Sequence, residues 1–380
     1  MWRRARPPLA GAAALAACLA VLALGGGDDE TTASATPPAP PGFLGIVAED
    51  AFGKPGAYRR VNLGRLRAAG AGLVRQTFDW ARIERSPGVY DFEFYDDFVH
   101  ALARRRLRVL PIVFNPPRFR SSAPARGAKR GSYPPARPAA MGAFAARLAR
   151  RYGPGGRLWR ANPDLPYLPI RSWQIWNEPN LSVYWPSGPD PAAYVRLLRP
   201  TARALRRVDP DAEIVTAGLP DSARGVPLAD YVRGMYDAGG ADAFDTLGLN
   251  TFARDAAGVL ETIRAARRVA AAHGDDPRMW ITELGWASDG PPSAFRVSPA
   301  EQAALVEQTV TTLARRRREL RLRGVVYFNW RDSLPYAGGQ DFFGLHTGLL
   351  ERDGRAKPAL GAYRGVAGRL GLLPEELPGP

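Results

Sequence analysis

The segment Ser172-Trp173-Gln174-Ile175-Trp176-Asn177-Glu178-Pro179 is an apolar run of strand length that ends in a glutamate. Farther along the chain, the segment Ile281-Thr282-Glu283-Leu284-Gly285-Trp286 has the same form. Short apolar runs bounded by turn-forming residues are typical of buried strands. Both segments therefore predict a strand that carries a glutamate to its carboxyl end.

Further apolar runs predict strands, and amphipathic stretches rich in Ala, Arg and Leu lie between them. The eight expected strands are 43–47, 73–78, 109–114, 172–176, 213–217, 246–250, 280–283 and 325–329. The expected helices include 59–69, 93–106, 139–151, 191–207, 228–238, 255–273 and 299–318. Eight alternating strand and helix units are the number in a closed parallel barrel. Since 380 residues with 46% hydrophobic composition can bury such a core, we expect an α/β fold with a single (β/α)8 TIM barrel.

Polar side chains gather where the expected strands end. Arg75 lies within the second strand, and the third, fourth, sixth and seventh strands end in Asn115, Asn177 with Glu178, Asn250 and Glu283. The longest connections, 116–138 and 331–348, also follow strand ends. In a (β/α)8 barrel the carboxyl ends of the strands form one face, and functional residues lie there. The sequence therefore predicts the functional site on that face.

Two glutamates on one face suit the cleavage of a glycosidic bond. One carboxylic acid must protonate the departing sugar oxygen, and an ionised carboxylate must meet the anomeric carbon as positive charge develops there. The sequence has no Gly-x-Ser-x-Gly elbow, no phosphate-binding glycine loop and no His-Glu-x-x-His pair. Cys18 is the only cysteine, so the mature domain has no thiolate metal site. We expect neither a metal nor another cofactor.

Five motifs together resemble a known clan of enzymes. They are Arg75, the turn 177–179, the pair Thr282-Glu283, Trp330, and the closing stretch 348–359. In this order the chain resembles the retaining glycoside hydrolases with (β/α)8 barrels, which include cellulase-type, β-xylosidase-type and related endoglycosidase families. The resemblance implies that Glu178 is the general acid/base, that Glu283 is the nucleophile, and that Arg75 keeps Glu283 ionised and oriented.

The resemblance also implies a set of substrate-binding residues. Asn177 would bind the sugar 2-hydroxyl, Trp330 and Trp286 would offer ring faces to the sugar, and the pair Tyr184-Trp185 would extend that platform. Asn115 and Asn250 complete the expected set. One departure from the clan is the segment Asn250-Thr251-Phe252, where many relatives carry a His and a Tyr that contacts the nucleophile. We take Tyr327 or Tyr336 as candidates for that contact.

The amino terminus predicts export. Residues 1–24 combine a basic start with an apolar run, as in a signal peptide, and Leu15-Ala16-Ala17-Cys18 resembles a lipidation site. An ordinary signal peptide, an uncleaved anchor and a lipoprotein attached through Cys18 remain alternatives, so we expect a secreted or cell-envelope-anchored protein. Residues 25–41 predict a disordered linker, 42–370 the hydrolase domain, and 371–380 a tail.

The net charge of +15 raises the question of a nucleic-acid partner. Only three of the 52 basic residues are lysines, and the arginines are spread along the whole chain. Such a bias toward arginine favours the interpretation that these residues cover solvated helix faces. The alternative is that they bind an anionic glycan or a cell-wall partner. We therefore expect a monomer with a carbohydrate substrate, and no nucleic acid.

Two other functions use the same residues. A non-catalytic glycan-binding barrel would keep the groove without turnover, and a transglycosylase would use both glutamates with a sugar acceptor in place of water. The presence of both carboxylates favours the hydrolase.

Overall fold

The computed structural model describes residues 37–49, 56–129, 131–336 and 339–375. The predicted targeting segment with Cys18, most of the predicted linker and the last five residues of the predicted tail lie outside these ranges. Within the described part of the chain, no helix is both long enough and apolar enough to cross a bilayer.

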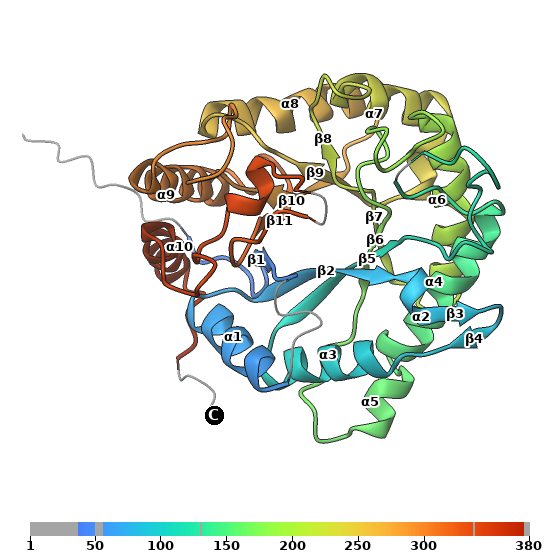
Figure 1. The fold of residues 1–380 in the computed structure, drawn as a ribbon, viewed down its shortest axis with the longest axis horizontal. Coiled ribbons are helices and arrows are strands. Elements are labelled where there is room, and N and C mark those ends of the chain that lie inside the picture. Colours follow the sequence, from blue (N-terminus) through green and yellow to red (C-terminus); the bar gives the residue numbers. More distant parts are fainter. Residues whose placement is uncertain (1–36, 50–55, 130, 337–338, 376–380) are drawn as a thin grey trace, which may run out of the picture. The chain divides into compact units, whose positions relative to one another are not determined.

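Eight parallel strands close into a ring, which confirms the predicted (β/α)8 barrel (Figure 1). Each strand pairs with the next one in the ring, and β10 closes it by pairing with both β9 and β11. The strands are β1 (Leu44–Val47), β2 (Leu73–Asp79), β5 (Arg108–Phe114), β6 (Ser172–Ile175), β7 (Glu213–Val215), β9 (Thr246–Asn250), β10 (Arg278–Leu284) and β11 (Leu322–Tyr327). All eight overlap the strands expected from the sequence.

Helices surround the ring of strands (Figure 1). They are α1 (Gly56–Ala68), α3 (Glu93–Arg104), α4 (Pro138–Tyr152), α6 (Pro191–Arg206), α7 (Leu228–Asp237), α8 (Ala256–Ala272), α9 (Pro299–Arg315) and α10 (Pro358–Arg369). Local sequence fixes several starts: Asp190 accepts a hydrogen bond from the Ala193 amide, and Ser298 forms a capping box with Glu301.

Several short elements were not expected from the sequence. They are α2 (Trp80–Ile83), α5 (Arg157–Ala161), the hairpin of β3 (Glu84–Ser86) and β4 (Val89–Tyr90), β8 (Leu219–Pro220), and the 3-10 turns η1 (Gly240–Ala243) and η2 (Phe343–His346). Segments of two to five residues are too short to show a hydrophobic period, so sequence patterns do not reveal them.

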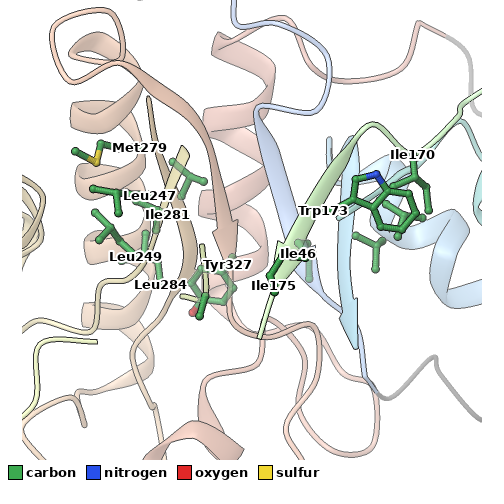
Figure 2. Close-up of a cluster of buried hydrophobic side chains, with 14 of the residues drawn as sticks. Ile46, Ile170, Trp173, Ile175, Leu247, Leu249, Met279, Ile281, Leu284 and Tyr327 are labelled. Atoms are coloured by element: carbon green, nitrogen blue, oxygen red, sulfur yellow. The ribbon is translucent and has the colours of Figure 1, made fainter. Parts of the chain in front are cut away.

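The strands bury both of their faces. Alternate residues such as Ile46, Met279 and Ile281 point outward into the large core between strands and helices (Figure 2). The residues between them, among them Val47 and Trp280, form a second cluster inside the barrel. This alternation follows from the two-residue period of a strand, and it explains why the runs read as continuously apolar.

The inside of the barrel changes from apolar to polar toward the carboxyl ends of the strands. On β2, Leu73 belongs to the inner apolar cluster, and Arg75, two residues later, points to the same side. Gln174 on β6 is fully buried and is hydrogen-bonded to Arg75. Charged and amide groups therefore lie at the mouth of the barrel above an apolar floor.

Candidate active site

Arg75 is the centre of the polar network at the mouth. Its guanidinium donates to Glu283 Oε1 at 2.7 Å, to Gln174 Oε1 at 2.7 Å and to Asn177 Oδ1 at 2.9 Å. The side chain is 2% exposed. A buried cation needs an anionic partner, and Glu283 supplies it. The contact that the sequence predicted between Arg75 and Glu283 is therefore present in the structure.

A bulge in β10 directs Glu283 toward the mouth. Ile281 pairs with Leu249 and Glu283 pairs with Asn250, so two steps along β10 match one step along β9. Ile281 points outward into the core, and strict alternation would turn Glu283 the same way. The extra residue of a bulge redirects the side chain that follows, and bulges are frequent next to active sites.

Asn250 connects the two glutamates. Its amide Nδ2 donates to Glu178 Oε1 at 2.7 Å, while its Oδ1 accepts from Thr282 Oγ1 at 2.8 Å. The same amide lies near Glu283, where it opposes the rise that burial causes in the pKa of that group. Glu178 and Glu283 lie close enough for the negative charge of Glu283 to help raise the pKa of Glu178. Gly218 makes room for this arrangement, because a Cβ there would lie 2.2 Å from Asn250 Oδ1.

The two carboxyl groups differ in protonation. Burial and, to a smaller extent, the negative charge of Glu283 raise the pKa of Glu178 to about 8. Burial also raises the pKa of Glu283, but the charge and hydrogen bond of Arg75 oppose that rise. Because Arg75 contacts Glu283 directly, Glu283 loses its proton first, and its charge then helps Glu178 to keep a proton.

The backbone around Glu178 is strained. Trp176 and Glu178 have φ angles of +75° and +42°, a region that residues with side chains rarely adopt. The Trp176 indole donates to the Tyr184 carbonyl at 2.9 Å and packs edge-on against Trp185 at 5.6 Å, which holds the turn in place. Strain of about 1–3 kcal/mol per residue persists where surrounding contacts enforce it, often at functional sites.

The predicted asparagines take different places. Asn177 lies beside Arg75, which occupies its Oδ1, so its amide nitrogen is the group left to donate to a substrate. Asn115, in contrast, donates to Asp79 Oδ2 at 3.0 Å and accepts from Ser132 Oγ at 3.2 Å. Asn115 therefore fixes the loop after β5, and Asn250 positions Glu178. The sequence had predicted that both asparagines contact the substrate.

The three tryptophans expected to face the sugar are buried in the protein. Trp330 and Trp286 are 0% exposed, and their indoles donate to Asn62 Oδ1 and to the Ala253 carbonyl. Trp185 is 2% exposed. The prediction of sugar platforms at these positions is therefore wrong, because beyond the strand ends the chain turns these rings into the packing between loops and helices. Of this set, Tyr184 alone is partly open.

Other aromatic side chains occupy the mouth. Strand alternation places Tyr327 outward, where its hydroxyl donates to the Thr347 carbonyl at 2.9 Å, so Tyr327 does not make the contact with Glu283 for which it was a candidate. The next residue, Phe328, is partly exposed and packs against the inner barrel cluster. Loss of solvent raises the pKa of Tyr336, and the negative charge of Glu283 adds to that rise, so Tyr336 lies near Glu283. Phe328 and Tyr336 are thus aromatic side chains at the mouth.

Glu49 is a third acidic group at the mouth that sequence reasoning missed. It follows β1 and lines a hollow of about 60 Å³ with Phe328, Asn329 and Tyr336. Loss of solvent and the negative charge of Glu283 raise its pKa, while the charge of Arg75 lowers it. Its signal in the sequence was the same one used for the other sites, an acidic residue just after an apolar strand.

Comparisons with known proteins agree with this fold. Neither a protein-family model nor a curated protein matches the sequence. Among solved structures, a family 39 glycoside hydrolase from Bacteroides cellulosilyticus WH2 matches with TM-score 0.61 and 19% identity over 86% of this chain and 63% of that one. A monomeric beta-xylosidase from Caulobacter crescentus CB15 matches with TM-score 0.62 and 16% identity over 87% and 69%. An exo-beta-1,4-mannosidase from Opitutaceae bacterium strain TAV5 matches with TM-score 0.57 and 18% identity over 86% and 60%.

The chain thus spans about two thirds of the length of these structures. At this level of identity the likeness shows the fold. The chain has the (β/α)8 barrel found in these glycoside hydrolases.

Proposed function

We propose that the protein is a retaining glycoside hydrolase that cleaves β-linked O-glycosidic bonds by double displacement. The observation that carries the proposal is the unequal environment of two neighbouring carboxyl groups. Glu283 is bonded to the Arg75 cation, whereas Glu178 is bonded to the neutral amide of Asn250 and has its pKa raised to about 8. One group is thereby ionised and the other protonated at neutral pH, as the reaction requires.

The first step uses the two groups in opposite roles. Glu283 attacks the anomeric carbon, and Glu178 gives its proton to the departing glycosidic oxygen, which leaves a glycosyl ester on Glu283. Direct attack requires the two carboxyl groups to lie about 5–5.5 Å apart, whereas enzymes that place water between them need about 6.5–9.5 Å.

The second step reverses the protonation of Glu178. Once Glu283 is esterified, its negative charge no longer raises the pKa of Glu178. Glu178 then takes a proton from the incoming water, which attacks the anomeric carbon and releases Glu283. Asn250 stays hydrogen-bonded to Glu178 in both charge states, because its amide can donate to either form.

The mouth supplies groups that can hold a sugar. The free amide donor of Asn177 lies beside the reacting centre, Glu49 can accept hydrogen bonds from hydroxyls, and Phe328 and Tyr184 offer ring surface.

The test is a screen of aryl β-xylosides, β-glucosides, β-galactosides and β-mannosides with the full chain. We expect hydrolysis of at least one, with proton NMR showing the β-anomer as first product. Glu178→Gln and Glu283→Gln should abolish it, whereas Glu307→Gln, on the exposed side of α9, should not. Release of the α-anomer, or activity in both active-site variants, would refute the proposal. A product joined to an added sugar acceptor would identify the transglycosylase alternative.

We also propose that the protein is an exported monomer. The support is the basic and apolar pattern of residues 1–24 in the sequence. Fractionation of cells that express the full chain, beside a Cys18→Ser variant, tests the location. Loss of membrane association in that variant alone would identify a lipoprotein, and sedimentation of the released protein would give its oligomeric state.

A further inference from the structure

An arginine-lined groove runs along the outside of the barrel between α4 and α6. It has a volume of about 650 Å³ and is lined by Arg147, Arg150, Arg196, Arg199, Arg203 and Arg207, together with small residues. We call these six residues the arginine groove. They lie outside the mouth and take no part in the chemistry proposed above.

Small side chains create the hollow. The two helices are in close contact, since a Cβ on Gly142 would lie 2.8 Å from the Pro200 carbonyl oxygen. Ala143 and Ala204 line the groove, so only short side chains separate the two rows of arginines. The result is a narrow furrow with cationic walls.

The charges in the arginine groove are poorly neutralised. No acidic residue lines it, and Arg150, Arg203 and Arg207 form no ion pair with any residue in the described ranges. Arg196 and Arg199 each have one acidic neighbour, at 3.5 and 3.2 Å. Many arginines elsewhere on the helices are paired, as in the exposed pairs Arg233–Asp230 and Arg316–Glu319. The arginine groove is distinguished by six arginines that line one hollow, with no acidic residue in that lining.

The arrangement of the arginines suits an extended chain. Arg196, Arg199, Arg203 and Arg207 follow one face of α6 and span about 16 Å at 1.5 Å per residue. Because each helix of a (β/α)8 barrel returns from the carboxyl to the amino ends of the strands, the groove begins near the side of the mouth and leads away from it. A linear polymer that enters the mouth could therefore continue along the groove.

We propose that the arginine groove binds a linear acidic polysaccharide through its carboxylate groups. Guanidinium groups bind carboxylates with two parallel hydrogen bonds, and a row of them matches a row of acidic sugars. No aromatic side chain lines the groove, although single-stranded nucleic acids and neutral sugars are usually held by ring stacking. The choice of a glycan rests on the proposed function of the mouth.

The test measures binding of fluorescein-labelled polymannuronate, a linear β-linked polyuronate, to the full chain carrying Glu178→Gln, so that turnover plays no part. The groove variant combines Arg150→Gln, Arg203→Gln and Arg207→Gln. The control variant makes the same change at Arg60, Arg318 and Arg364, which are exposed on other parts of the surface. It therefore removes the same amount of charge. We expect at least tenfold weaker binding in the groove variant, with a smaller salt dependence, and less than a twofold change in the control.

A second variant guards against loss of folding. Arg203→Lys with Arg207→Lys keeps the charge but removes the paired hydrogen bonds, and we expect an intermediate loss of binding. Equal weakening in the groove and control variants would overturn the proposal, and so would tighter binding of oligo-dT than of polymannuronate, or no binding of polymannuronate at all. If aryl β-glycosides are not hydrolysed but polymannuronate binds as described, the proposed function fails while the groove stands.

Discussion

Replacing Glu283 by Gln should lower the pKa of Glu178. Glu283 contributes a negative charge that helps to raise the pKa of Glu178 to about 8. At the oxygen separation of about 5.5 Å that a retaining mechanism requires, and at an effective dielectric constant of about 20, that charge is worth about 3 kcal/mol, or roughly two pKa units. We therefore expect the pKa of Glu178 to fall to roughly 6. Burial, the larger cause, remains and keeps it above that of an ordinary glutamate.

The assay is an NMR titration of the protein labelled with ¹³C at its glutamate carboxyl groups. Glu178→Gln identifies the Glu178 signal by its disappearance, and Glu307→Gln controls for changes in distant charge. Gln at position 283 can still accept a hydrogen bond from Arg75, which also keeps Gln174 and Asn177 as partners. A Glu178 pKa that stays near 8 in Glu283→Gln would show that the two carboxyl groups are not coupled, and the account of the acid-to-base change would fail.

Four further substitutions test other parts of the site. Asn250→Ala removes a hydrogen bond that lowers the pKa of Glu178, so the alkaline limb of the pH profile of kcat/KM should move to higher pH. We also expect kcat to fall about 10- to 100-fold. An unchanged pH profile would contradict the positioning role of Asn250. Glu49→Gln should raise KM for an aryl β-glycoside several-fold, with little change in kcat, and equal loss in both would place Glu49 in the chemistry instead. Trp330→Phe should lower Tm without changing KM, because the indole is buried and hydrogen-bonded to Asn62. Phe328→Ala, in contrast, should raise KM. The reverse pattern would restore Trp330 as the residue on which the sugar lies.

The barrel could be predicted because its signal is repeated eight times. Each strand buries one face against the helices and the other inside the barrel, so its sequence is a continuous apolar run. Glu178 and Glu283 could be predicted as neighbours because the carboxyl ends of parallel strands meet on one face. The short hairpin of β3 and β4 carries no such repeated signal.

The directions of individual side chains could not be predicted. Glu283 reaches the mouth through a bulge in β10, and nothing in the apolar run marks where the bulge occurs. Trp330 lies only two residues beyond Phe328, but the chain has by then turned its ring toward Asn62 on α1. Gln174 is an amide inside an apolar strand, and its role became visible only through its bond to Arg75. These positions depend on contacts between distant segments, which local sequence does not encode.

The most direct test of the central claim is to trap the covalent intermediate on the enzyme. A 2-deoxy-2-fluoro glycosyl fluoride of the sugar that the enzyme accepts slows the second step, so the sugar stays attached and can be located by mass spectrometry of peptides. The account predicts one label per chain, on Glu283, that water or an added acceptor slowly removes. A label on Glu178 or Glu49, or turnover of the natural linkage with no label on Glu283, would contradict it.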